Sequence, residues 1–247
     1  MLLDGKVMVT QRDEHIYHEM LVHPAMLAHP DARNVLVVGG GDGGTIREIT
    51  RYPGVERAVL AEIDDEVIEA SQKYFPELTS GLSDPRVEIH VGDAAQYVRD
   101  SLSKGDRFDV CFVDCTDVAG PGPTDIAATL ITDEFLDNIC KILTPDGIMV
   151  AQSESPVYSA SYVKHYSQRL SARFPHVATY VIMVPSYAGI WSLTWASKSI
   201  DPSSEITRIP PEGLKYYRPE LFRAALEMGR LEFWGPPPEA DSKSTRF

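Results

Sequence analysis

Basic side chains are scarce in this sequence of 247 residues. Lysine and arginine together number 23 against 36 aspartates and glutamates, and the formal net charge at pH 7 is −13. A nucleic-acid-binding protein needs a basic surface to neutralise phosphates, and an anionic membrane surface attracts the same charge. The charge balance therefore argues against both partners, and it is compatible with a small cationic substrate.

Cysteines and long apolar runs are also few. Cys111, Cys115 and Cys140 lack metal-ligand spacing, and their odd number suits a reducing compartment. His18 and His23 are one residue too far apart for the H-E-x-x-H zinc motif. No apolar run approaches the roughly 18 residues of a membrane span, and no charged-then-apolar signal segment opens the chain. We therefore expect a cytoplasmic protein without a metal site.

From residue 34 onward, short runs rich in β-branched residues alternate with stretches that have apolar residues at helical spacing. Apolar residues are nearly continuous in most of the runs, as expected for parallel strands covered on both faces. This alternation predicts a doubly wound sheet. The expected strands are 34–40, 57–63, 86–93, 108–114 and 147–153.

The last part of the sheet is expected to differ. Residues 176–198 hold two strand-like runs separated only by Pro185–Gly189, and so short a connection permits only an antiparallel pair. Five parallel strands followed by a hairpin are typical of the class I methyltransferase-like (Rossmann-like) fold. The predicted fold class is therefore α/β, with a doubly wound, mostly parallel sheet that ends in an antiparallel hairpin.

A glycine-rich loop, "GGGDGG", connects the first strand to a helix. Gly39, Gly41 and Gly44 satisfy G-x-G-x-x-G, in which glycines permit a tight turn and a close approach to a ligand. Asp42 in the same loop would repel a pyrophosphate and favour a cation. The loop therefore favours an adenosyl sulfonium over a dinucleotide.

Acidic residues follow the next two strands. Glu62 ends the second strand, where the partner of a ribose diol lies in this geometry. Asp93 and Ala94 follow the third strand, where an adenine amino group would lie. The alternative for Asp93 is that it only caps the next helix.

Two further aspartates follow the central run "FVDCTD". Asp114 lies at the carboxyl end of a parallel strand, where open α/β sheets bind ligands. Asp117 has a simpler alternative as a turn residue before a Gly/Pro loop. Both carboxylates are interpreted as partners for cations.

Together these segments resemble the polyamine aminopropyltransferases, the spermidine synthase family. "GGGDGG", "EID", "VGD" and "DCTD" occur in the order and spacing of that family, as do "LDG", "RDEHIYHEM", "QSE", "PSY" and "LKYY". The similarity covers essentially residues 2–232. It implies transfer of an aminopropyl group from decarboxylated S-adenosylmethionine, a co-substrate, to an amine such as putrescine, with release of 5′-methylthioadenosine. Neither a metal nor another cofactor is expected.

The resemblance also implies roles for residues of the donor pocket. Glu62 would accept hydrogen bonds from the ribose hydroxyls, and Asp93, beside Ala94, one from the adenine amino group. Asp42 would hold the ammonium of the aminopropyl arm together with Asp114, and His18 would lie beside the donor. Gly39 and Gly41 belong to the loop that lines this pocket.

On the acceptor side, the resemblance implies that Asp114, helped by Tyr17, orients and deprotonates the attacking amine. Asp117, Glu154 and Tyr187 would line the acceptor channel. The alternatives left open are a core position for Tyr17, a packing role for Tyr187 and a solvated carboxylate for Glu154.

The resemblance also implies a division of the chain. Residues 1–10 are expected to be the remnant of an N-terminal β-hairpin domain and 11–234 the catalytic domain. The Pro-rich, polar composition of 235–247 predicts a flexible tail. A homodimer is the expected assembly. The loop after Asp117 is longer than usual for the family, and Met8 replaces a common glutamine, so the acceptor amine stays open.

Four functions are therefore considered. The first is spermidine synthesis from putrescine, and the second is transfer to a longer polyamine, giving thermospermine or spermine. The third is a binding protein that keeps the pocket but has little turnover. The fourth, an ordinary S-adenosylmethionine methyltransferase, has no use for Asp42 and Asp114 together.

Overall fold

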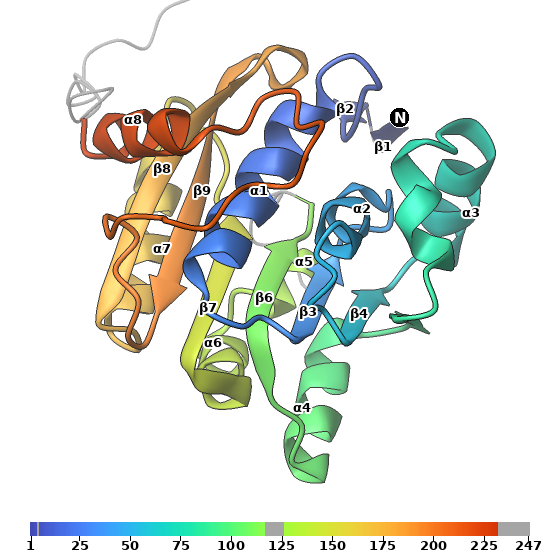
Figure 1. The fold of residues 1–247 in the computed structure, drawn as a ribbon, viewed down its shortest axis with the longest axis horizontal. Coiled ribbons are helices and arrows are strands. Elements are labelled where there is room, and N and C mark those ends of the chain that lie inside the picture. The colour runs from blue at the N-terminus through green and yellow to red at the C-terminus, as the bar shows by residue number, and fades with distance from the viewer. Residues whose placement is uncertain (4, 117–125, 232–247) are drawn as a thin grey trace, which may run out of the picture.

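A computed structural model describes residues 1–3, 5–116 and 126–231 of the chain (Figure 1). Asp117, most of the loop after it and the tail 235–247 lie outside the described residues, so the expectations for them stay predictions. Every helix within the described ranges falls short of the length and hydrophobicity needed to cross a bilayer.

Seven strands form one sheet in the order β5-β4-β3-β6-β7-β9-β8. The first five along the chain pair in parallel, while β9 runs antiparallel to both β7 and β8. The predicted fold class is thereby confirmed. The strands are β3 (Asn34–Gly39), β4 (Arg57–Glu62), β5 (Val87–Val91), β6 (Phe108–Asp114), β7 (Leu143–Gln152), β8 (His176–Val184) and β9 (Gly189–Ser197).

Helices cover both faces of this sheet (Figure 1). The α-helices are α1 (Glu14–Ala28), α2 (Gly44–Thr50), α3 (Asp65–Tyr74), α4 (Ala94–Lys104), α5 (Ile126–Thr129), α6 (Asp133–Ile142), α7 (Ala160–Ser171) and α8 (Pro219–Gly229). Two 3-10 turns, η1 (Leu78–Ser83) and η2 (Pro185–Tyr187), and a small hairpin of β1 (Leu2–Leu3) and β2 (Lys6–Val7) complete the described elements.

Burial on both faces explains the nearly continuous apolar runs. In β3, Val35 and Val37 pack in the core formed with α1, α2 and α8, while Leu36 and Val38 pack in the core formed with α4, α6 and α7. All four side chains are inaccessible to solvent. Since successive side chains of a strand point to opposite faces, a central strand needs apolar residues at every position.

The chain changes direction across the sheet between β3 and β6. It leaves β3 through β4 to β5 at one edge and then returns to β6 on the other side of β3. The register places Gly39 beside Asp114 at the carboxyl ends of these two strands. Ligands of open α/β sheets bind at such a switch point, so the topology brings the predicted loop and the predicted base together.

The N-terminal hairpin is tied to the rest of the molecule. Leu2 pairs with Val7 in β1 and β2, and the N-terminal ammonium donates to the carbonyl oxygen of Val9 at 2.7 Å. The Tyr187 hydroxyl donates to the carbonyl oxygen of Met8 at 2.6 Å. Residues 1–10 thus contain a short hairpin, and its origin as the remnant of a larger domain stays a prediction.

The "LKYY" segment has a structural partner in α1. The buried carboxylate of Glu19 accepts hydrogen bonds from the backbone N–H groups of Lys215, Tyr216 and Tyr217 at 2.7 to 2.8 Å. A buried carboxylate needs such donors to offset the loss of its hydration. This contact fixes the segment that leads into α8 against α1.

A chain of alternating charges runs from α2 through α1 to the glycine-rich loop. Arg47 donates to both carboxylate oxygens of Glu14 at 2.9 Å. Glu14 lies 2.8 Å from Nδ1 of His18, and Nε2 of His18 lies 3.4 Å from Asp42. Burial alone would lower the pKa of His18, but Asp42 and Glu14 raise it well above its ordinary value of 6.5. The two carboxylates thus favour the charged form of the imidazole.

Glu14→Gln tests this charge network. Burial alone would raise the pKa of Glu14, but hydrogen bonds from His18 and Arg47 lower it from 4.5 to about 2. A lowered pKa in the folded state gives stability that is present above pH 4.5 and lost as the pH falls toward about 2. We expect the variant to lose about 3 kcal/mol of unfolding free energy at neutral pH, measured in urea.

The difference between wild type and Glu14→Gln should narrow as the pH falls below 4.5. Glu69→Gln is the control, because Glu69 is an exposed residue of α3 and its neutralisation should change stability little. A constant difference between the Glu14→Gln variant and wild type across this range would contradict the network.

Close packing of α8 on β8 generates a second prediction. A Cβ atom at Gly229 would lie 1.8 Å from the carbonyl oxygen of Thr179. Gly229→Ala should therefore lower the unfolding free energy by about 1–3 kcal/mol, because helix and strand must separate. Gly54→Ala is the matched control, since nothing lies within 4 Å of its Cβ position. Equal stability of the two variants would refute the close contact.

Candidate active site

A cavity of about 860 Å³ opens at the carboxyl ends of β3, β4 and β6, with residues of the N-terminal hairpin in its wall. It brings together most of the residues that the sequence predicted. Those that line it are Tyr17, Gly39, Gly41, Asp42, Glu62, Asp93, Ala94, Asp114 and Tyr187. The cavity lining in the described part of the chain does not include His18 or Glu154.

The glycine-rich loop packs directly against the acidic residues. Gly39 has a φ of 77°, and a Cβ atom there would lie 2.4 Å from the carbonyl oxygen of Asp114. At Gly44 a Cβ atom would lie 2.3 Å from the His18 ring. Any larger residue would push the loop away from β6 or from α1. Glycine is therefore required here by contacts within the protein.

Glu62 is held by three backbone groups. Its carboxylate accepts hydrogen bonds from the N–H groups of Gly41 at 2.9 Å, Ile63 at 2.7 Å and Asp64 at 3.1 Å. Burial raises the pKa of Glu62, and nearby Asp114 adds to the increase, while the three donors oppose it. The carboxylate is thus fixed in orientation at the wall of the cavity, where it can accept hydrogen bonds from a diol.

Asp93 caps a helix, which is the structural role that was left open for it as an alternative. It is the N-cap of α4, and one oxygen accepts a hydrogen bond from the N–H of Ala95 at 2.8 Å. Asp93 and Ala94 also line the cavity. Capping uses only one carboxylate oxygen at this distance, so the geometry leaves acceptor capacity for a ligand.

Asp114 occupies the centre of the site. The Tyr17 hydroxyl donates to one carboxylate oxygen and the Thr45 hydroxyl to the other, both at 2.6 Å. Burial raises the pKa of Asp114 and the charge of Asp42 raises it further, while His18 and the two hydroxyl groups oppose the increase. Tyr17 is therefore more than a core residue, because its hydroxyl reaches the predicted base.

Asp42 is exposed to the cavity, whereas His18 is buried next to it. Asp42 lines the cavity, and its carboxylate accepts a hydrogen bond from the N–H of Gly44 at 2.8 Å. His18 is buried, with 1% of its surface exposed, and its Nε2 lies 3.4 Å from Asp42. His18 thus lies behind the carboxylate and can support its negative charge.

Tyr187 lines the cavity, but its hydroxyl is directed to the carbonyl oxygen of Met8. Its ring makes edge contacts with Tyr17 at 5.7 Å and Trp191 at 5.2 Å between ring centroids. The packing role left open for Tyr187 is therefore present. The same ring still forms part of the cavity wall beside Tyr17.

Glu154 is buried, so the alternative of a solvated carboxylate is wrong. It adopts a left-handed conformation with a φ of 62°. Its N–H donates to the side chain of Gln152 at 3.0 Å, and its carbonyl oxygen accepts from Ser192. A left-handed non-glycine residue is unfavourable unless its surroundings hold it. Here Gln152 and Ser192 supply that support.

The sequence predicted no role for Thr45 or for Gln152, although Gln152 begins the segment "QSE". Thr45 follows the glycine-rich loop and reaches Asp114 across the switch point. Gln152 lines the cavity and donates to the carbonyl oxygen of Cys115 at 3.0 Å. The available signals were a hydroxyl in the first turn of the helix after the loop and a polar residue at the end of a parallel strand.

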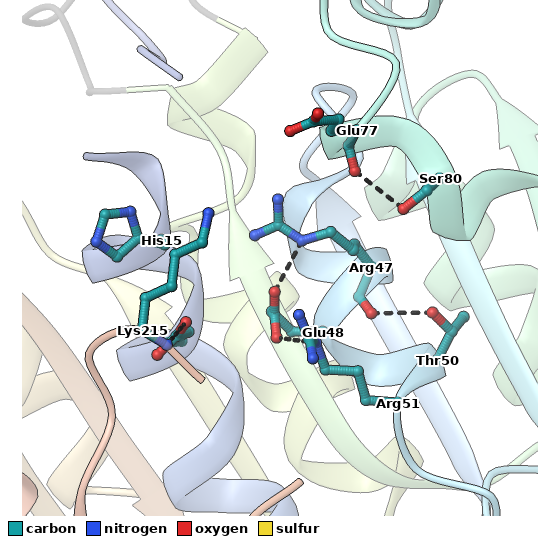
Figure 2. A pocket seen from close by; sticks show the side chains of 9 residues that line it. His15, Arg47, Glu48, Thr50, Arg51, Glu77, Ser80 and Lys215 are labelled. Atoms are coloured by element: carbon teal, nitrogen blue, oxygen red, sulfur yellow. Dashed lines mark hydrogen bonds and ion pairs between the residues drawn. The ribbon is translucent and has the colours of Figure 1, made fainter. Parts of the chain in front are cut away.

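A second cavity, of about 390 Å³, lies between α1, α2 and η1. Figure 2 shows Arg47, Glu48 and Arg51 on its α2 side, with His15 and Lys215 opposite. Glu48 lies 2.8 Å from Arg47 and 2.7 Å from Arg51. This cavity therefore contains the outer end of the charge network, while the predicted donor-site acids line the larger cavity.

Among the described residues, no group of three or more His, Cys, Asp or Glu side chains is arranged to hold a metal ion. Two carboxylates, those of Asp42 and Asp114, line the larger cavity beside the N-terminus of α2. Their negative charge attracts a cation and repels a phosphate.

Comparison with known proteins gives consistent results. The family described as "Spermine/spermidine synthase domain" matches residues 14–206. A polyamine aminopropyltransferase of Thermoanaerobacter sp. (strain X514) is 42% identical over 231 residues, which are 93% of this chain and 80% of that protein. The enzyme of the same name from Leptospira biflexa serovar Patoc (strain Patoc 1 / Ames) is 43% identical over 227 residues, covering 90% of this chain and 78% of that protein.

Solved structures agree with these relatives. A spermidine synthase in complex with the transition state analogue AdoDATO has a TM-score of 0.84 and 39% identity, covering 91% of this chain and 76% of that one. Spermidine synthase from Thermotoga maritima has a TM-score of 0.80 and 38% identity, covering 91% of this chain and 75% of that one. Sequence, fold and similarity over most of its length therefore place the chain in the spermine/spermidine synthase family, as an aminopropyltransferase.

Proposed function

We propose that the chain transfers the aminopropyl group of decarboxylated S-adenosylmethionine to a di- or polyamine. Putrescine is the first acceptor, giving spermidine, and 5′-methylthioadenosine is the second product. The main support is the pair of carboxylates, Asp42 and Asp114, in one cavity with Tyr17. A similar spermidine synthase in complex with the transition state analogue AdoDATO also supports this reaction.

Donor binding is assigned to the side of the cavity formed by β3, β4 and α4. Glu62 accepts hydrogen bonds from the ribose hydroxyls, and Asp93 one from the adenine amino group, with Ala94 beside it. Gly39 and Gly41 bring the loop close to the nucleoside. Their close packing against Asp114 and Glu62 supports this role, because it aligns the loop with both acids.

The aminopropyl arm carries an ammonium group, which Asp42 and Asp114 bind. His18 lies outside the cavity and does not contact the substrate. Its positive charge stabilises the partly buried Asp42 carboxylate. Without such a cation, the negative charges of the two neighbouring carboxylates would repel each other with no compensating positive charge nearby. The charge network through Glu14 and Arg47 thus contributes to substrate binding.

The reaction requires a neutral amine. A primary amine has a pKa near that of lysine, about 10.4, so it arrives protonated. Asp114 accepts one proton, and Tyr17 keeps the carboxylate in position. The nitrogen lone pair then forms a bond to the aminopropyl carbon next to sulfur, the carbon–sulfur bond breaks, and its electrons go to the sulfonium sulfur. The sulfur thereby becomes neutral, so no separate acid is needed for the leaving group.

The acceptor enters along Tyr187 and Trp191, beside Tyr17. The contacts between these aromatic rings support a wall that suits the methylene chain of an amine. We keep Asp117 and Glu154 as proposed acceptor contacts, although the described cavity lining does not include Glu154. A longer acceptor, giving thermospermine or spermine, remains the second proposal, since the loop after "DCTD" differs from the usual family pattern. A homodimer and a cytoplasmic location complete the proposal.

A product assay tests the function. The protein is incubated with decarboxylated S-adenosylmethionine and a panel of diamines and polyamines, and the products are identified by mass spectrometry. Spermidine and methylthioadenosine are expected with putrescine. Absence of methylthioadenosine with every amine would support a binding protein instead. A methylated product formed from S-adenosylmethionine would support the methyltransferase.

Asp114→Asn tests the base. Asparagine keeps the size of the side chain but cannot accept the proton, so turnover should fall by at least ~10²-fold, as is typical for loss of a general base. Asp65→Asn is the control, because Asp65 is an exposed carboxylate in α3. Both variants should give the same circular dichroism spectrum as wild type. Near-normal turnover of the Asp114→Asn variant would exclude Asp114 as the base.

A neutral analogue tests the acidic acceptor site. 1,4-Butanediol has the length of putrescine but no positive charge, so it should not compete with putrescine for the carboxylates at low ionic strength. Initial rates are measured at increasing diol concentration, with a non-reactive diammonium compound of similar length as the positive control. Equal inhibition by the diol and the diammonium compound would mean that charge does not select the acceptor.

A further inference from the structure

We propose that Thr45 is a positioning residue for Asp114, which it holds in the orientation and charge state that proton transfer requires. This inference rests on the proposed function, in which Asp114 is the base. It concerns a residue that lies in the first turn of α2, directly after the glycine-rich loop. Thr45 itself is buried and does not line the cavity, so it acts through Asp114.

The geometry of Asp114 supports the inference. Thr45 Oγ1 lies 2.6 Å from Oδ2 of Asp114, and the Tyr17 hydroxyl lies 2.6 Å from Oδ1. The two donors come from α2 and α1. Rotation of an aspartate carboxylate about χ2 has only a broad preference. A hydrogen-bond donor at each oxygen therefore fixes the plane of the Asp114 carboxylate, whereas a single donor would leave the carboxylate free to rotate.

The direction of the Thr45 hydroxyl is informative in itself. Further along the same helix, the hydroxyl of Thr50 donates to the backbone carbonyl oxygen of Arg47, three residues earlier. Thr45 instead donates to Asp114, which is 69 positions away in the chain. A hydroxyl can donate to an ionised carboxylate, whereas a protonated carboxyl has to use one oxygen as a donor itself. The contact therefore favours the ionised form.

Several charged groups face Asp114 and oppose one another. From the glycine-rich loop, Asp42 disfavours the ionised form, and Glu62 at the end of β4 adds negative charge nearby. From α1, His18 favours the ionised form, and Tyr17 does so through its hydrogen bond. The Thr45 hydroxyl acts in the same direction as His18 and Tyr17. Its removal should therefore raise the pKa of Asp114 and move the acid limb of the rate profile to higher pH.

Thr45→Val and Thr45→Ser form a matched pair. Valine keeps the β-branched shape but lacks the hydroxyl, and serine keeps the hydroxyl. For the valine variant we expect kcat to fall roughly tenfold, the lower end for a hydrogen bond to a charged group, with a smaller rise in the KM for the donor, because Asp42 also binds its ammonium group. The acid limb of kcat against pH should move upward. Serine should restore both properties, and thermal unfolding checks that both variants are folded.

A second measurement needs no turnover. The carboxyl carbon of Asp114 is followed by ¹³C NMR as the pH changes, and its signal is identified by its loss in Asp114→Asn. Thr45→Val should move the titration to higher pH, and Thr45→Ser should not. If the wild type transfers no aminopropyl group, the proposed function fails while this titration still tests the contact.

Three results would overturn the proposal. The first is an Asp114 titration that is the same in wild type and the valine variant. The second is a shifted titration with unchanged kcat, which would show that the contact does not position the base. The third is a serine variant that behaves like the valine variant, because loss of packing would then explain both.

Discussion

The close approach of β3 and β6 at their carboxyl ends is the constraint on which the rest of the site depends. Gly39 lies beside Asp114 in the register, and a side chain there would collide with the Asp114 backbone. The switch in chain direction leaves a crevice at this edge, so Asp114 faces a cavity and not the core. A glycine at the end of one strand therefore allows a carboxylate at the end of the next to meet a ligand.

Negative charge at this position needs support, because burial and Asp42 both raise the pKa of Asp114. The support comes from groups behind the cavity wall. His18 faces Asp42, and Arg47 neutralises Glu14 on the other side of His18. Alternating signs keep Glu14 and Asp42 next to a cation, which limits the cost of placing several charges in a region of low dielectric constant. The charges can remain oriented before a substrate arrives, and this preorganisation is what electrostatic catalysis requires.

The fold and the gathering of acidic residues at the strand ends could be predicted from the sequence, because their signals are local. Each central strand is nearly continuous in apolar residues since both faces are covered, and Glu62, Asp93 and Asp114 follow strands at the edge where parallel strands end together. The contact of Thr45 with Asp114 could not be predicted in this way. It joins residues far apart in the chain, and no spacing rule records it. The burial of Glu154 likewise depends on β9, which supplies Ser192.

The wall of the cavity formed by Glu62 and Asp114 and the wall formed by Tyr187 are positioned by different parts of the fold. Glu62 and Asp114 are the last residues of central strands, so the sheet determines their separation. Tyr187 lies in a short turn between β8 and β9, and its hydroxyl is bound to the backbone next to the N-terminal hairpin. A change in the hairpin can therefore move the acceptor wall without moving Asp114. For the proposed reaction, we therefore expect the sheet to determine the reaction class and the segments at its periphery to determine the choice of amine.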